Sequence, residues 1–262
     1  MIAELLKKYG FDRLKKAPTT PATPSLLQDP KSISGNSSFE RKEYLSLVMS
    51  LMFIARFTRH DIQFAVTTLA TRCADPRQSD WHHALRVLRY LAGTRKIAPI
   101  FDGKVELKPV IYADSSHNCH PTGHGHGGMI ITLGSAPIHS QSFKLKLATR
   151  SSSESELVVL EESSTFAPWL RLLFRELGVR FGNRPFTVYQ DNKSTITIAE
   201  TGGGNFKRTK HLISREAFVK ERIENGDIKL VYINSSRMRA DFLTKPLSKA
   251  TLLGHLSHLS LI

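Results

Sequence analysis

The chain has 262 residues, of which 40% are hydrophobic and 23% are charged, and this composition excludes a wholly disordered protein. Its 37 lysine and arginine residues exceed its 23 aspartate and glutamate residues, and the net charge of +14 favours a polyanionic partner, nucleic acid before an anionic membrane. The two cysteines exclude a disulfide framework, and no apolar run reaches the ~20 residues of a membrane helix. We therefore expect an intracellular protein of a reducing compartment with no membrane partner.

The first part of the chain predicts a linker followed by helices. Residues 1–38 end in a stretch with four prolines among serines and threonines, which is typical of a linker. Apolar residues then recur at helical spacing in three stretches, which begin near Tyr44, Asp61 and Ser79. We expect a three-helix unit within residues 39–104.

The pattern changes after residue 104. Strands are predicted over residues 110–114, 128–133, 138–143, 186–191 and 228–233. Helices are predicted over residues 152–177, 192–200, 208–224 and 237–243. This order indicates the α/β class, in the form of an α+β domain around one mixed sheet, over residues 105–247. Residues 248–262 follow as a C-terminal tail, and the tryptophans Trp81 and Trp169 are both expected in the core.

Histidines gather just after the first predicted strand. His117, Cys119, His120, His124 and His126 fall within ten residues, between glycines. Their spacing matches no paired zinc signature, so we expect a flexible polar hairpin and no stoichiometric zinc.

Four carboxylates stand out by their positions. Asp114 and Asp191 each end a predicted strand, Glu156 lies near the start of a helix, and Asp241 lies in the last short helix. Carboxylates that converge raise one another's pKa unless cations are present. Two Mg²⁺ ions ~4 Å apart are suited to clamp the attacking and leaving oxygens of a phosphodiester. The alternative, which spacing alone leaves open, is four unrelated helix caps or surface charges.

Several short motifs add a stronger signal. They are Tyr112-Ala-Asp114 and residues 150–156, 191–196, 208–211 and 239–247. In order and spacing they resemble the Y-A-D, S-S-T-E-A-E, D-N-Q-S-A-I, R-T-K-H and A-D-I-L-T-K-P-L motifs of the ribonuclease H (RNase H) domain in copia-type retrotransposon Pol polyproteins. Residues 44–52, 59–65 and 86–94 resemble the region that joins the reverse transcriptase of that family to its nuclease. The resemblance covers nearly the whole chain.

The resemblance implies an RNase H-like fold, a five-stranded mixed sheet flanked by helices, preceded by a small helical connection region. It also implies a metal-dependent endonuclease that hydrolyses the RNA strand of RNA–DNA hybrids with two Mg²⁺ or Mn²⁺ ions. The residues that fall on the catalytic, metal-binding acids are Asp114, Glu156, Asp191 and Asp241. Glu154 is the rival of Glu156, and because residues two apart on a helix point about 200° apart, only one of them can face the sheet. We favour Glu156.

The same resemblance implies the partners and the location. The expected partners are the RNA–DNA hybrid and the polymerase part of the same polyprotein, in a cytoplasmic, particle-associated or nuclear setting. The polymerase motif Y-x-D-D is absent from this sequence, so we do not expect DNA synthesis by this chain. The residues expected to bind nucleic acid are Lys144, Lys146, Arg150, Asn192, Ser194, Lys207, Arg208, Lys210 and His211.

Two departures from the family keep alternatives open. Ser116 stands where the family usually has a second acid, which favours a non-catalytic, nucleic-acid-binding relic as the alternative. A DNA-strand transferase of the same superfamily is disfavoured, because its acids follow a different order. No histidine closely precedes Asp241, unlike in many cellular enzymes, and His211 is either a substitute for it or an ordinary surface residue.

Overall fold

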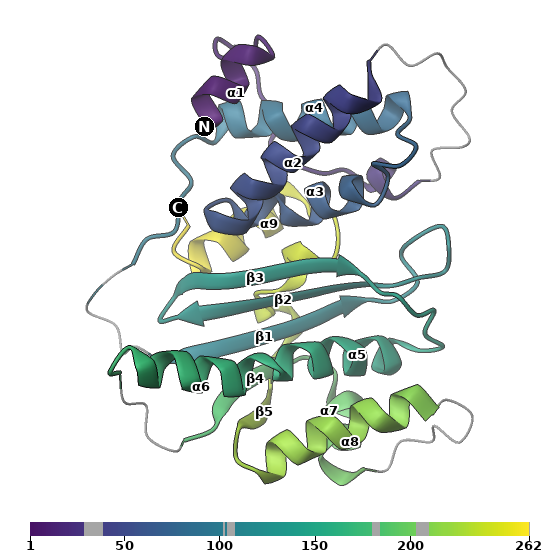
Figure 1. Ribbon diagram of the computed structural model, residues 1–262, viewed down its shortest axis with the longest axis vertical. Helices are drawn as coiled ribbons and strands as arrows, with labels where there is room; N and C mark the ends of the chain where they lie inside the picture. The colour runs from purple at the N-terminus through teal and green to yellow at the C-terminus, as the bar shows by residue number, and fades with distance from the viewer. Residues whose placement is uncertain (29–38, 102, 104–107, 180–183, 203–209, 262) are drawn as a thin grey trace.

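The computed structural model describes residues 1–28, 39–101, 103, 108–179, 184–202 and 210–261 (Figure 1). Its centre is a five-stranded sheet in the order β3-β2-β1-β4-β5. The strands are β1 (Pro109–Ser116), β2 (His126–Leu133), β3 (Ala136–Lys144), β4 (Phe186–Gln190) and β5 (Ile228–Tyr232). The first three pair antiparallel, and β1–β4 and β4–β5 pair parallel. The predicted mixed sheet is confirmed.

Helices cover both faces of the sheet, which makes three layers (Figure 1). The lower layer contains α5 (Ser152–Ser164), α6 (Phe166–Glu176), α7 (Lys193–Thr201) and α8 (Lys210–Glu224). The upper layer contains α1 (Ile2–Lys8), α2 (Arg41–Phe57), α3 (Gln63–Ala70), α4 (Gln78–Gly93) and α9 (Lys249–His258). Short 3-10 turns lie at Pro24–Leu27, His60–Ile62, Ser235–Arg237 and Asp241–Leu243. The three helices expected within residues 39–104 are therefore present.

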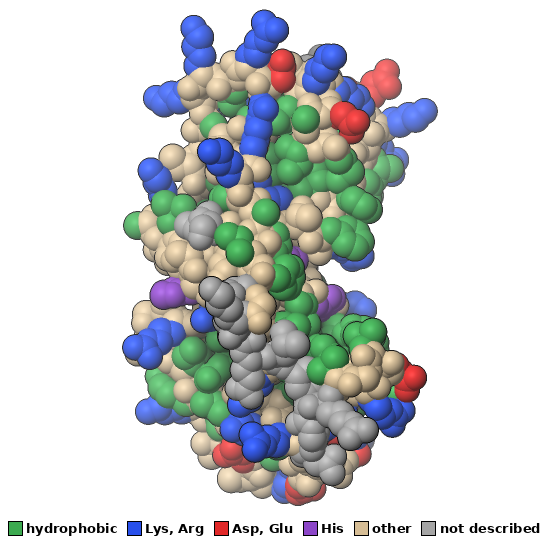
Figure 2. Space-filling view, turned by 90° about the vertical axis from the view of Figure 1, so that its left-hand side faces the viewer, with side chains coloured by type: hydrophobic (Ala, Val, Ile, Leu, Met, Phe, Trp, Pro, Cys, Tyr) green, Lys and Arg blue, Asp and Glu red, His purple; other side chains and the backbone are tan. Residues whose placement is uncertain are grey.

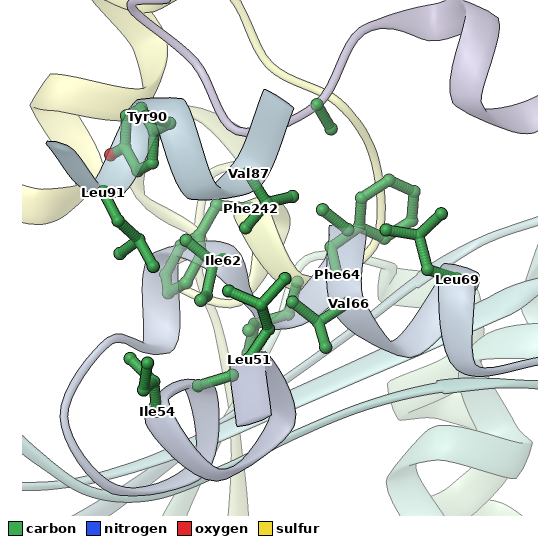
Figure 3. Close-up of a cluster of buried hydrophobic side chains, with 14 of the residues drawn as sticks. Leu51, Ile54, Ile62, Phe64, Val66, Leu69, Val87, Tyr90, Leu91 and Phe242 are labelled. Atoms are coloured by element: carbon green, nitrogen blue, oxygen red, sulfur yellow. The ribbon is translucent and has the colours of Figure 1, made fainter. Parts of the chain in front are cut away.

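Alternation along the strands divides the core between the two layers. Ile111 and Ile131 point into the cluster formed with α5, α6 and α8, whereas Tyr112 and Ile130 point into the cluster formed with the upper helices. Phe242, the neighbour of Asp241, lies in the upper cluster (Figure 3). The upper helices thus fix the turn that carries the last of the four acids.

Several predicted elements differ in the structure. The helix expected over residues 152–177 is broken at Thr165, because Pro168 has no N–H to donate to the carbonyl of Ser164 and its ring crowds that carbonyl. Trp169 is 50% exposed, since the buried face of α6 is made by Ala167, Leu170 and Phe174. The core position expected for Trp169 is therefore wrong, while Trp81 is buried as predicted.

The ends of the chain are also more ordered than the sequence indicated. The segment expected as a tail over residues 248–262 contains α9, whose Leu252 and Leu256 are buried in the upper cluster. Leu26, in the segment expected as a linker, is buried there too.

The short helix expected over residues 237–243 is two separate 3-10 turns. No helix within the described part of the chain is long and apolar enough to cross a membrane.

Candidate active site

Three of the four predicted acids meet at one edge of the sheet. Tyr112 of β1 pairs with Tyr189 of the parallel β4, so Asp114 and Asp191, two residues further along each strand, lie at the same level. Glu156 reaches them from the second turn of α5, which packs against β1. One carboxylate oxygen of each residue lies within 4.8 Å of those of the other two. Asp114 and Glu156 are buried, and Asp191 is half-buried.

Both oxygens of Glu156 are held by hydrogen bonds. The backbone N–H of Ser115 donates to Oε1 at 3.1 Å, and Nε2 of Gln190 donates to Oε2 at 3.2 Å. Oε1 of Gln190 accepts from the backbone N–H groups of Asp191, at 2.8 Å, and Asn192, at 3.0 Å. Gln190 therefore connects two of the acids, and nothing in the sequence beyond its position at a strand end indicates this role.

Glu154 points elsewhere, as the preference for Glu156 requires. Its carboxylate accepts the backbone N–H of Arg150 at 2.7 Å, while its own N–H donates to the cap residue Ser151 at 3.2 Å. The Ser151 side chain thus caps a free N–H of the first turn of α5, while the Glu154 carboxylate binds the N–H of Arg150 just before the cap.

Asp241 is close enough to Asp114 for its charge to act on that carboxylate, and it is outside the group within 4.8 Å. Its Oδ1 forms an ion pair with Nζ of Lys245, and Nε2 of His255 on α9 lies 3.8 Å from its Oδ2. The histidine near the last acid is thus His255, whereas His211 is exposed at the start of α8. Sequence reasoning missed His255 because it lies in the segment that was expected to be a tail.

Burial and mutual repulsion change the acidity of the cluster. Burial, with the negative charges of Asp241 and Asp191, raises the pKa of Asp114 to about 7. Burial, with the charges of Asp114 and Asp191, raises the pKa of Glu156 well above its ordinary value. Buried carboxylates of this kind are stabilised in ionised form by a cation, and an all-oxygen donor set fits a hard divalent ion such as Mg²⁺ or Mn²⁺.

The histidines after β1 are packed inside the protein. His126 is fully buried between β3 and Phe64 of α3, and its Nδ1 lies 3.0 Å from Nε2 of the buried His120. The flexible polar hairpin expected there is therefore wrong, because two of the imidazoles form part of the core between the hairpin and the upper layer.

The residues expected to bind nucleic acid are spread over several elements. Arg150 is exposed just before α5, and Asn192 caps α7 and donates to Oγ of Ser153 at 3.3 Å. Lys144 and Lys146 line a cleft of about 690 Å³ between α2, α3, β3, α5 and α8, and none of the four acids lines that cleft. Further members of the set, Ser194, Lys210 and His211, are exposed on α7 and α8, and Lys207 and Arg208 lie outside the described residues.

The face shown in Figure 2 has lysine and arginine side chains over both its upper and its lower part. They do not gather in one patch on this face. Overall charge therefore agrees with a polyanionic partner but does not by itself locate where such a partner binds.

Comparison with known proteins places this architecture in context. No family model matches the sequence. The chain is 32% identical over 251 residues to the retrovirus-related Pol polyprotein from transposon RE1 of Arabidopsis thaliana, an alignment that covers 95% of this chain and 17% of the relative. The chain thus spans about a sixth of the length of the curated relative. The resemblance to retrotransposon Pol polyproteins is confirmed.

The solved structures to which the chain is similar include RNase H domains. The N-terminal RNase H domain of rv2228c from Mycobacterium tuberculosis is 17% identical, with a TM-score of 0.40, over 58% of this chain and 97% of that chain. LC11-RNase H1, solved in complex with an RNA/DNA hybrid, is 18% identical, with a TM-score of 0.38, over 52% of this chain and 94% of that chain.

Proposed function

We propose that the chain is an RNase H-type endonuclease that hydrolyses the RNA strand of RNA–DNA hybrids, as part of a retrotransposon Pol polyprotein. The observation that carries this proposal is the convergence of Asp114, Glu156 and Asp191 within 4.8 Å, with Asp241 near enough for its charge to act on Asp114. The relationship to Pol polyproteins over 95% of the chain supports it.

In this proposal the four acids hold two Mg²⁺ or Mn²⁺ ions. Asp114 would contact both, Asp241 would hold the one on the side of the attacking water, and Glu156 and Asp191 the one on the side of the leaving 3′-oxygen. Divalent cations at such a site lower the pKa of bound water and stabilise the leaving oxygen. The chain itself keeps Glu156 oriented through Ser115 and Gln190, and the expected products are 5′-phosphate and 3′-hydroxyl ends.

The hybrid would be recognised by its shape, its 2′-hydroxyls and its phosphates, without base reading. Reversing the charges of Lys207, Arg208 and Lys210 is therefore expected to weaken hybrid binding and to flatten its salt dependence, by about 1 in slope for each lysine or arginine that no longer neutralises a phosphate. The measurement is the Kd for a fluorescent hybrid at several KCl concentrations. The control is charge reversal at Lys7 and Lys8, which are exposed on α1. Unchanged affinity in the first variant would defeat this assignment.

A non-catalytic relic that binds nucleic acid is the second candidate, because Ser116 occupies the position of the family's second acid. The deciding experiment incubates the protein with a labelled RNA–DNA hybrid and Mg²⁺ or Mn²⁺, beside an Asp191→Asn variant. Single-stranded RNA and duplex DNA serve as control substrates. We expect cleavage of the hybrid's RNA strand by the wild type alone. Equal inertness of the two proteins would overturn the nuclease and leave the relic as the remaining candidate.

A further inference from the structure

The residue Thr244, which ends the turn carrying Asp241, touches the acidic cluster directly. Its side chain is completely buried, and its Oγ1 donates to Oδ2 of Asp114 at 2.6 Å. The backbone carbonyl of Asp241 lies 3.0 Å from the same hydroxyl. One hydroxyl therefore joins the acid at the end of β1 to the turn that holds the last acid, 130 residues away in sequence.

The turn itself is anchored to the sheet from the other side. Oγ of Ser142 on β3 donates to the carbonyl of Leu243 at 2.7 Å, and Nε2 of His126 lies 2.7 Å from that Oγ. Because the single Ser142 proton goes to a carbonyl, His126 must donate through Nε2 and accept at Nδ1 from Nε2 of His120. The hydrogen bonds therefore run in one direction, from His120 through His126 and Ser142 to the carbonyl of Leu243 in the turn.

The sequence also leaves room for this close approach. Gly128 of β2 pairs with Asp114, and a Cβ at Gly128 would lie 2.7 Å from both Cβ of Leu243 and Cγ2 of Thr244. Any larger residue would move the turn away from the sheet and separate the Thr244 hydroxyl from the carboxylate. Gly128, Ser142 and Thr244 thus all support the contact between the turn of Asp241 and the carboxylate of Asp114.

We infer that Thr244 is a positioning residue for Asp114: its hydroxyl fixes the orientation of this carboxylate for divalent cations and couples it to the turn of Asp241. This inference rests on the proposed function, because it assigns a role within the same site. Hydrogen bonds behind metal ligands typically change metal affinity by about 10- to 100-fold when they are removed.

The test replaces Thr244 by valine, which keeps the shape and removes the hydroxyl, and by serine, which keeps the hydroxyl. Mn²⁺ binding to the free protein is measured by calorimetry, and the Mg²⁺ concentration for half-maximal hybrid cleavage is measured in parallel. We expect Thr244→Val to weaken Mn²⁺ binding by about tenfold and to raise the Mg²⁺ requirement by about the same factor. Thr244→Ser is expected to remain within about twofold of the wild type, since the hydroxyl behind the metal ligand is still present.

Thr132→Val is the matched control. Thr132 is completely buried on β2, and its hydroxyl has no hydrogen-bond partner among the described residues. The Thr132→Val substitution should leave Mn²⁺ binding unchanged. Wild-type affinity in Thr244→Val, or an equal loss in the serine and valine variants, would overturn the inference. A wild type that neither binds Mn²⁺ nor cleaves the hybrid would instead defeat the proposed function.

Discussion

Replacing Glu156 by glutamine is expected to lower the rate of hybrid cleavage by about a thousandfold, because a metal site supplies several kcal/mol of charge stabilisation and each 1.36 kcal/mol is a factor of ten. The two oxygens of Glu156 are held by Ser115 and Gln190 at the centre of the cluster. Glutamine has nearly the same size but only one oxygen and no charge, so the fold should persist while the metal ligand is removed. The measurement is single-turnover cleavage of a labelled hybrid.

The control for this variant lies two residues earlier. Glu154→Gln makes the same chemical change on the same helix, but the Glu154 carboxylate accepts the backbone N–H of Arg150 and does not face the acids. We expect it to cleave at nearly the wild-type rate and to lose at most a modest amount of stability. Equal rates in the two variants, whether both fast or both slow, would show that the register of α5 is not what selects the catalytic acid.

A second large effect is expected in the stability of the metal-free protein. The pKa of Asp114 is about 7 in the folded state against an ordinary value of 3.8, so folded protein holds a proton over this range that unfolded protein has released. The stability that Asp114 contributes is therefore fully present below pH 3.8 and is lost as the pH rises through about 7. The effect on the free energy of unfolding is of the order of a few kcal/mol.

Six histidines whose pKa is lowered by burial act in the opposite direction and must be separated from this effect; they are His60, His83, His120, His126, His139 and His255. Burial lowers the pKa of His60 and His120 to about 4 and that of His126 to about 3. Folded protein then binds fewer protons than unfolded protein between about pH 4 and 6.5, so these residues make stability rise with pH. The difference between wild type and Asp114→Asn, which share the histidines, gives the contribution of Asp114 together with its effect on the pKa of Glu156.

We therefore expect the free energy of unfolding of the wild type, relative to Asp114→Asn, to fall by a few kcal/mol between about pH 4 and 7 in EDTA. Millimolar Mg²⁺ should restore the lost stability of the wild type above about pH 7, since a bound cation stabilises the ionised acids. Urea denaturation of the two proteins at a series of pH values measures this. Parallel pH profiles of the two proteins would contradict the raised pKa.

The sequence was sufficient to predict the parts of the site that depend on local pattern. Asp114 and Asp191 could be placed because each follows an apolar run that predicts a strand, and parallel strands end at one edge. Helix geometry allowed only one of Glu154 and Glu156 to face the sheet, and the resemblance to RNases H favoured Glu156. The predicted sheet was correct for the same reason, since its strands have clear apolar runs.

The contacts that fix the acids were not predictable in the same way. Thr244 contacts Asp114 from 130 residues further along the chain, and His255 approaches Asp241 from 14 residues further along. Both pairings follow from tertiary packing. Lys245 pairs with Asp241 at helical spacing, yet a lysine four residues after an acid is common on any surface. The break at Thr165 was different, because Pro168 signals it in the sequence.

The measurement that tests the central claim most directly is the number of Mn²⁺ ions bound by the complex of the protein with a hybrid whose RNA strand is made non-hydrolysable, counted by electron paramagnetic resonance and corrected for the hybrid alone. Two ions per chain are expected for the wild type. Fewer than two are expected for Asp114→Asn, because this variant lacks one buried carboxylate of the site. An equal count in the two proteins, or no bound ion in either, would contradict the proposal that these acids form a divalent-cation site.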